Sequence, residues 1–337
     1  MKGSFVRYLI AGCFVALVIL YITQQKTIPQ TNPTSTTSDV TQLQSNTSIS
    51  KAPPATETSK PPVPAPPTPE TTTAVKQSEK LPEKQIQSIA ILPQELFPGD
   101  VIYLESTEHP TVYLWDKKFN LQPMEKKFVR FIPIPLETKP GLYPILSGTK
   151  KSIATVQIKA KQFAVDEITV SEQMESMQRN TKRINADQQK INKARSTSSP
   201  KPYFNNTFIV PVEGEETTPY GYRRVVNKKP ANPHLAIDIA NKEGTPVLAS
   251  QDGKVVLADT MYLNGNMIIL DHGLRVYSTY SHLSVVNVKP GEMVKRGQVI
   301  GKVGTTGFST GPHLHYAMLI GNTFVNPNSF FMNHFMK

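Results

Sequence analysis

One long segment of this sequence lacks the residues needed to build a packed core. Residues 23–96 contain no Phe, Tyr or Trp and are rich in Thr, Ser, Gln and Pro, with a proline-rich run at 61–69. Such a composition cannot bury enough apolar surface to offset the entropy lost on ordering. The proline run favours an extended spacer, with a ligand for a peptide-binding domain as the alternative. We therefore predict a disordered tether over residues 27–88.

The segment before the tether is apolar. Residues 8–22 form an uninterrupted, mostly apolar run that is preceded by Lys2 and Arg7. No small-x-small cleavage site follows this run, which favours an uncleaved transmembrane helix within residues 1–26. A cleaved signal peptide and a lipoprotein processed at Cys13 are the alternatives. The positive charges before the run predict a single-pass protein of the cytoplasmic membrane, with its N-terminus inside and the remainder in the periplasm or cell-wall space.

Cysteine content and charge restrict the chemistry of the exported part. A single cysteine among 337 residues excludes a disulfide scaffold and any multi-cysteine metal site. The net charge of +11 suits an anionic partner such as nucleic acid, lipid head groups or cell wall. The basic residues are spread along the chain rather than gathered in one patch, so we predict no nucleic-acid partner.

Two further regions are expected before the C-terminal part. Residues 89–165 show short runs of alternating hydrophobicity separated by Pro-Gly turns, which predict a small sandwich-like β domain. Pro133 and Pro135 suggest that one of its strands lies at an edge. Residues 166–202 are polar, and the absence of Gly and Pro from Glu172 to Arg195 predicts a helical connector. A capping box formed by Thr169 and Glu172 fits the start of that helix. The strands expected in the β domain are 101–104, 111–114, 128–134 and 152–160.

The C-terminal region, residues 203–337, is predicted to be an all-β domain. Glycines recur about every ten residues, with β-branched runs between them. With the preceding domain this makes the fold class mainly β. The expected strands include 245–249, 253–258, 266–270, 275–280 and 298–303.

Five of the seven histidines lie between His234 and His315. In a strand, the pair His313 and His315 would present both imidazoles on one face, about 7 Å apart. His234 and Asp238 would be about 13 Å apart in a straight strand, so sharing one ion requires the chain to bend between them. His234, Asp238 and one histidine of the pair would then leave a position open for water, as in a catalytic zinc site. Spacing alone leaves ordinary core or surface histidines as an alternative.

The order of these motifs resembles a known family. His234 and Asp238, the run 280–283 around His282, and the run 310–315 around His313 and His315 look like the three signature blocks of the lysostaphin/LytM-type zinc metallopeptidases. The similarity covers residues 208–330. It departs from the family at Ala236, where glycine is usual, but this change removes no ligand. Supporting runs lie at 218–224, 244–247, 271–273, 288–298 and 326–327.

The resemblance implies a site and a function. It implies one zinc ion per chain, bound by His234, Asp238 and His315. His282 and His313 would flank a zinc-activated water and the scissile carbonyl as catalytic residues. The implied function is a peptidoglycan endopeptidase that hydrolyses peptide cross-links of the bacterial cell wall, in a membrane-anchored member with an antiparallel β-sheet catalytic domain.

Two other functions are alternatives to this one. Some relatives have lost zinc ligands and act as non-catalytic activators or scaffolds of other cell-wall hydrolases, but all five positions are filled here. The run 294–301 also resembles a turn of a lipoyl or biotinyl carrier domain, which would leave the histidines unexplained. The remaining histidines receive ordinary roles: His109 in a turn, His272 capping a turn and His334 in the tail. The sequence predicts no oligomeric state.

Overall fold

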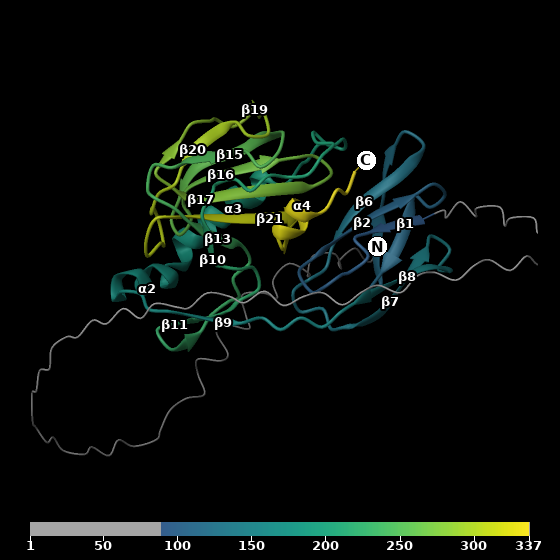
Figure 1. Ribbon diagram of the computed structural model, residues 1–337, viewed down its shortest axis with the longest axis horizontal. Helices are drawn as coiled ribbons and strands as arrows, with labels where there is room; N and C mark the ends of the chain where they lie inside the picture. Colours follow the sequence, from purple (N-terminus) through teal and green to yellow (C-terminus); the bar gives the residue numbers. More distant parts are fainter. Residues whose placement is uncertain (1–88, 337) are drawn as a thin grey trace, which may run out of the picture. The chain divides into compact units, whose positions relative to one another are not determined.

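The computed structural model describes residues 89–336, and they are mainly β (Figure 1). The predicted anchor, residues 1–26, and tether, residues 27–88, lie outside the described residues. Among the helices that are described, none has both the length and the apolar character that a membrane span requires.

The N-terminal part of the described chain contains two four-stranded antiparallel sheets that pack face to face. Their shared core is aliphatic and includes Ile102, Leu104, Ile132 and Val156. This is the sandwich-like arrangement that the alternating pattern predicted. One sheet has the order β1 (Ile89–Leu92), β2 (Val101–Ser106), β6 (Lys127–Pro133), β5 (Gln122–Met124). The other has the order β4 (Lys117–Asn120), β3 (Thr111–Leu114), β7 (Gly141–Ser147), β8 (Ser152–Ile158).

Strand β2 is buried on both faces. Ile102 and Leu104 point into the sandwich core, whereas Val101 and Tyr103 belong to a second core shared with the C-terminal region. Because successive side chains alternate across a strand, β2 joins two hydrophobic cores. The ring of Phe131 lies in the second core with that of Phe330, at a centroid distance of 6.1 Å. The sandwich is therefore attached to the C-terminal region by an apolar interface.

The edge-strand prediction for the proline-containing segment is wrong for the strand as a whole. Strand β6 lies between β2 and β5. However, β5 pairs only with residues 127–129, so Pro133 has a partner on one side alone, in β2. The missing amide hydrogen of proline is tolerated there because that stretch of β6 has no second neighbour.

The connector contains two helices rather than the single helix expected. Helix α2 (Glu172–Arg179) ends at Asn180, whose backbone leaves the helical region at φ −80° and ψ 70°. The Asn180 side chain accepts a hydrogen bond from Arg183 N and begins α3 (Thr181–Ala194). Asparagine favours this local bonding over a continuous helix. Ser171, and not Thr169, is the N-cap of α2, because its hydroxyl accepts from Met174 N.

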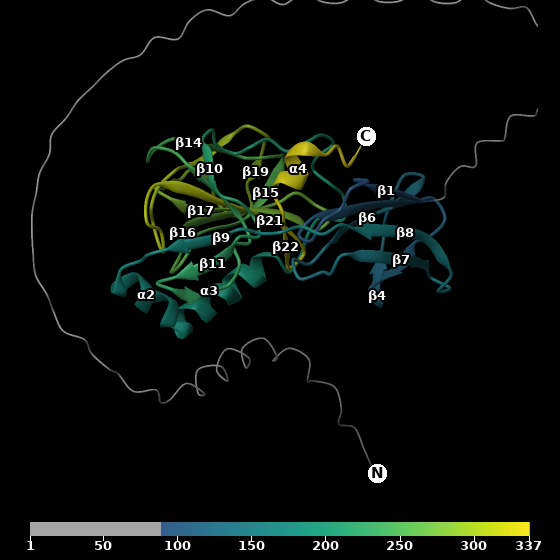
Figure 2. The same cartoon turned by 60° about the horizontal axis from the view of Figure 1, so that its bottom comes forward.

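A short strand that was not predicted precedes these helices. Strand β9 (Val165–Ile168) runs parallel to β11 (Arg223–Val226), with Arg224 opposite Asp166 (Figure 2). Strand β11 also pairs with β12 (Lys229–Pro230). The connector is therefore part of the structure around the C-terminal sheet, and α3 packs Ile191 and Ala194 against it.

The C-terminal region is built on a large antiparallel sheet. The five strands predicted for this region are confirmed with shifted ends, three of them in the large sheet and two in a smaller one. Hydrogen bonding in the large sheet places β13, β21 and β17 side by side, which positions the site described below. Its order is β10 (Glu215–Thr218), β13 (Ile237–Ala240), β21 (His313–Ile320), β17 (Val276–Leu283), β16 (Gly265–Asp271), β15 (Gly253–Met261), β19 (Met293–Val294), with β22 (Thr323–Val325) paired to β21. The remaining elements are the sheet β14 (Pro246–Leu248), β20 (Val299–Lys302), β18 (Val285–Val286) and helix α4 (Asn328–Met332).

Candidate active site

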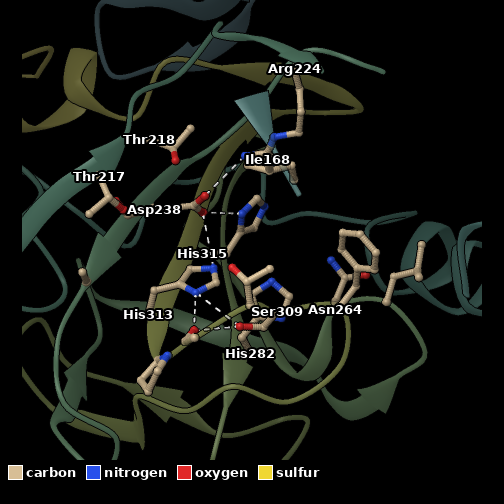
Figure 3. A pocket seen from close by; sticks show the side chains of 16 residues that line it. Ile168, Thr217, Thr218, Arg224, Asp238, Asn264, His282, Ser309, His313 and His315 are labelled. Carbon is tan, nitrogen blue, oxygen red and sulfur yellow. Dashed lines mark hydrogen bonds and ion pairs between the residues drawn. The ribbon is translucent and has the colours of Figure 1, made fainter. Parts of the chain in front are cut away.

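Three predicted ligand residues converge at one point of the large sheet. His315 Nδ1 lies 2.7 Å from Asp238 Oδ1, and His234 Nε2 lies 3.2 Å from Asp238 Oδ2. One ligand atom from each residue falls within 4.8 Å of the others. Figure 3 shows Asp238 and His315 directed toward each other in the pocket. Two imidazoles and one carboxylate in this arrangement can hold a metal ion.

Strand register brings two of these residues together. Asp238 on β13 is the direct cross-strand partner of His315 on β21. His234 comes from the segment just before β13, where its backbone N–H donates to Tyr222 O at 2.9 Å and its carbonyl accepts from Gly221 N. These two bonds fix the backbone of His234 outside β13, and its ring reaches Asp238, four residues later in the chain.

His282 and His313 lie beside the three ligand residues. The ring of His282 is 4.9 Å from that of His313 and 5.7 Å from that of His315 between centroids. His313 begins β21, and His282 lies near the end of β17 with a φ of 64°. A left-handed backbone at a non-glycine residue is unfavourable and is often found at functional sites. Thus all five side chains named from the sequence are brought into one cluster.

Backbone carbonyls set the tautomers of both additional histidines. Nδ1 of His282 lies 2.8 Å from Thr306 O, and Nδ1 of His313 lies 2.8 Å from Gly311 O. A carbonyl oxygen can only accept, so each Nδ1 carries a hydrogen and each neutral ring has its lone pair on Nε2. The same reasoning applies to His234, whose Nδ1 faces Pro219 O at 3.3 Å. Nε2 of all three histidines is therefore available to a metal or a proton.

Burial and neighbouring charges determine the protonation of the cluster. Burial, together with the imidazoles of His315 and His313, lowers the pKa of His282 to about 3, so the ring is neutral near pH 7. Burial also lowers the pKa of His315. Burial alone would raise the pKa of Asp238, but the neighbouring imidazoles of His315 and His234 outweigh it and hold that pKa well below its usual range. Asp238 is therefore ionised.

The cluster lies in a groove of about 370 Å³. Its walls come from β9 and β10, from the loop after Met261 and from the loop before β21. The residues lining it beyond the cluster are Ile168, Thr217, Thr218, Arg224, Ala240, Leu263, Asn264, Phe308, Ser309, Thr310, Gly311 and Pro312.

Arg224, whose guanidinium faces the Asp238 carboxylate, was not among the site residues predicted from the sequence. Arg224 Nη2 lies 3.5 Å from Asp238 Oδ2, and its Nε donates to Asp166 Oδ2 at 3.0 Å. Arg224 belongs to one of the supporting runs, but no local pattern links it to Asp166, 58 residues earlier. The contact depends on the unpredicted pairing of β9 with β11.

The turn-capping role predicted for His272 is wrong. Its side chain is fully buried, with Nδ1 donating to Asp252 O and Nε2 accepting from Ser278 Oγ, each at 2.7 Å. It packs against the ring of Phe208 at a centroid distance of 4.9 Å. Both ring nitrogens are satisfied within the core, so His272 is a structural residue. His109 lies in a turn, as predicted, where its N–H donates to Ser106 Oγ.

Comparison with known proteins identifies this region. Residues 232–327, which include all five clustered side chains, match peptidase family M23. The C-terminal region contains an M23 peptidase domain. This family is the one that the ordered His and Asp motifs resembled, and the M23 domain carries the sheet on which the cluster lies.

Individual relatives agree with this assignment. Peptidoglycan DD-endopeptidase ShyA from Vibrio cholerae is 45% identical over 94 residues, covering 28% of this chain and 22% of that protein. DD-carboxypeptidase/endopeptidase Mpg from Neisseria meningitidis is 42% identical over 113 residues, covering 34% of this chain and 26% of that protein. The chain thus matches about a quarter of the length of these relatives.

A solved structure extends the similarity beyond the M23 domain. A crystal structure from Pseudomonas aeruginosa assigned to peptidase M23 aligns with a TM-score of 0.53 at 29% identity. The alignment covers 70% of this chain and 95% of that one. Because 70% exceeds the share occupied by the M23 match, the similarity includes part of the region before it.

Proposed function

We propose that this protein is a zinc-dependent endopeptidase that hydrolyses peptide cross-links of bacterial peptidoglycan. The observation that carries the proposal is the cluster itself: three ligand atoms within 4.8 Å, flanked by the imidazoles of His282 and His313, which line a groove. A purely structural histidine cluster would have its ring nitrogens satisfied internally, as those of His272 are. Among the described residues, Nε2 of His282 and Nε2 of His313 form no hydrogen bond, and both histidines line the groove.

The donor set fits zinc. His234 and His315 each offer a nitrogen and Asp238 offers an oxygen, which is the three-ligand set of catalytic zinc sites. Among the described residues this group contains no thiolate and no second carboxylate, which disfavours a closed structural zinc site and a calcium site respectively. Bound zinc supplies Lewis-acid chemistry, polarising a peptide carbonyl and lowering the pKa of water.

The flanking histidines supply proton transfer. In its neutral form each presents an Nε2 lone pair that can accept a proton from the attacking water. The protonated ring can then donate that proton to the leaving amine. The other ring, when it is protonated at Nε2, can donate a hydrogen bond to the negatively charged carbonyl oxygen. The carbonyls of Thr306 and Gly311 keep both rings oriented through the cycle.

The substrate class is inferred from the relatives. The matched proteins from Vibrio cholerae and Neisseria meningitidis are named as peptidoglycan DD-endopeptidase and DD-carboxypeptidase/endopeptidase. We propose the same kind of substrate, a peptide cross-link, for this chain because its five clustered side chains lie within the matched segment. The basic net charge of +11 suits a polymer that bears carboxylates.

The proposed location follows from the sequence alone. The apolar run at residues 8–22 and the positive charges before it support an anchor in the cytoplasmic membrane with the M23 domain outside the cytoplasm. Protease added to intact spheroplasts should degrade the M23 domain if this topology is right, whereas protection would contradict it.

The decisive experiment is digestion of purified sacculi. Zinc-loaded protein should release cross-link peptides, and His313→Ala should lose release by about 10²–10⁴-fold while keeping its zinc. His315→Ala should lose both release and zinc. Asn328→Ala, outside the groove, serves as the control and should retain both. Equal peptide release by wild type and His315→Ala would exclude this function. Full zinc binding without release would favour a non-catalytic activator of other hydrolases.

A further inference from the structure

Three arginines come together far from the candidate active site. Arg130 lies on β6, Arg195 follows α3, and Arg275 immediately precedes β17. Arg195 Nη1 lies 3.4 Å from Gly321 O, and the guanidinium of Arg275 packs against the same glycine. The positive charge of Arg275 lowers the pKa of Arg130. Within residues 89–336, none of the three forms an ion pair with a carboxylate, and their only side-chain hydrogen bonds are two long ones from Arg195.

A cavity of about 310 Å³ opens at two of these arginines. Arg130 and Arg275 line it, and Arg195 directly precedes the serine-rich loop at residues 196–200 that forms another wall. This volume is at the lower end of the range for ligand sites in proteins. The other lining residues are Gln122 and Leu274.

Holding these arginines together is unfavourable without a counterion. Burial lowers the pKa of Arg130, as does the charge of Arg275, and burial lowers the pKa of Arg195. The Nε atoms of Arg130 and Arg195 are buried and have no hydrogen-bond partner in the described chain. A guanidinium does not deprotonate in proteins, so neither charge can be removed by loss of a proton. An anion bound in the cavity beside Arg130 and Arg275 would supply a compensating negative charge and acceptors for their guanidinium N–H groups.

The backbone that presents Arg275 is constrained by the connector. Leu274 and Arg275 have φ values of 53° and 65°, a left-handed backbone conformation that residues other than glycine rarely adopt. Leu274 N donates to Ser199 O at 2.8 Å, and Arg275 N donates to Ser198 Oγ at 2.9 Å. Such local strain, maintained by surrounding bonds, is characteristic of functional sites.

The nearby carboxylate of Asp271 is already occupied by this loop. Its Oδ1 accepts from Ser198 Oγ at 2.6 Å and from Gly273 N at 2.9 Å, and its Oδ2 accepts from Ser199 N at 3.1 Å. Asp271 therefore holds the loop in place, and among the described residues it forms no ion pair with the arginines.

We propose that this cavity, the arginine pocket, binds an oxyanion with the chemistry of a phosphate group. A phosphate presents several oxygens and up to two charges, which matches converging guanidiniums better than a single carboxylate does. Arg275 and His282 are seven residues apart along β17, which corresponds to about 23 Å. The occupant is therefore not the peptide bond at the M23 cluster. It is a separate phosphate, free or part of a phosphodiester.

Calorimetric titration of the full-length protein tests this site. The probes are inorganic phosphate, sn-glycero-3-phosphoglycerol as a soluble phosphodiester head group, and acetate as a carboxylate. At least one phosphate probe should bind with a Kd of about 1 mM or tighter. Arg130→Gln and Arg275→Gln should each weaken binding by about 10-fold or more. Arg296→Gln removes the same charge at an exposed position elsewhere and should bind as wild type does.

The outcomes separate the possible sources of the phosphate. Tighter binding of inorganic phosphate assigns the pocket to free phosphate or a monoester, and tighter binding of the head group assigns it to a phosphodiester. Absence of binding by both phosphate probes overturns the proposal. So does binding no tighter than that of acetate, or binding retained in whichever arginine variant is folded by circular dichroism. Peptide release from sacculi is not a readout here, so the result is independent of the proposed peptidase activity.

Discussion

Asp238 and His315 are direct partners across the antiparallel pair of β13 and β21, with the carboxylate Oδ1 2.7 Å from the imidazole Nδ1. The two residues are 77 positions apart in the chain, yet register alone places their side chains on the same face of the sheet. His234 reaches the same carboxylate through its other oxygen. Strand pairing therefore positions two of the three proposed metal ligands, and the third comes from the segment just before β13.

Removing the carboxylate should abolish metal binding without unfolding the domain. Asp238→Asn keeps the shape of the side chain but removes the negative charge that faces His234 and His315. We expect bound zinc to fall from about one equivalent to less than about a tenth after dialysis. Metal analysis of dialysed protein measures this, and Asp259→Asn, on an exposed part of β15, is the control. Stoichiometric zinc in the Asp238 variant would remove Asp238 from the ligand set.

Local patterns in the sequence account for much of the fold. Alternation of apolar and polar residues located the strand 111–114 with the correct ends, and several others within a few residues. The five clustered side chains could be named because they lie in short ordered motifs. His313 and His315, for example, share a face simply because a strand has a period of two.

Features that depend on distant pairings could not be predicted in this way. The break at Asn180 arises from a side chain that competes for local hydrogen bonds, although the surrounding composition favours a continuous helix. The contact of Arg224 with Asp166 requires the parallel pairing of β9 and β11. The burial of His272 depends on Ser278 and Asp252, which lie on either side of it in the chain but meet it only in the folded sheet.

A glycine behind His282 should be essential for the shape of the site. Gly307 has a φ of 76°, and an added Cβ would collide with the backbone of Leu263 and Gly265. The preceding residue, Thr306, accepts through its carbonyl oxygen the hydrogen bond from Nδ1 that orients the His282 ring. Gly307→Ala should therefore destabilise the protein by about 1–3 kcal/mol and lower peptide release. Urea unfolding and sacculus digestion measure the two effects.

The matched control for this substitution is Gly148→Ala. Gly148 does not have a positive φ, and the nearest atom to an added Cβ is Thr111 O at 3.9 Å. It should change stability by less than about 0.5 kcal/mol. Equal stability and activity of the two variants would show that the backbone around Gly307 does not hold His282 in place.

The apolar interface between the sandwich and the M23 domain should contribute strongly to stability. Phe131 is fully buried and contacts the rings of Phe204, Phe330 and Phe335 at centroid distances between 5.5 and 6.1 Å. Phe131→Ala should reduce the free energy of unfolding by about 3–5 kcal/mol. Leu142→Ala, at a side chain that is 69% exposed, should have almost no effect. A small loss for Phe131→Ala in denaturant titration would contradict a tightly packed interface.

Burial of His272 should make stability depend on pH. Burial lowers its pKa to about 4 from the usual histidine value of 6.5, so the unfolded chain binds a proton first as pH falls. Its contribution is complete above pH 6.5 and decreases toward pH 4, with a loss of about 2 kcal/mol between pH 7.5 and pH 5. His272→Gln removes this titrating group. Between pH 7.5 and pH 5, the free energy of unfolding of the wild type should therefore fall by about 2 kcal/mol more than that of the variant. Urea unfolding of the zinc-loaded proteins at the two pH values measures the difference. Parallel losses in both proteins would refute the assignment.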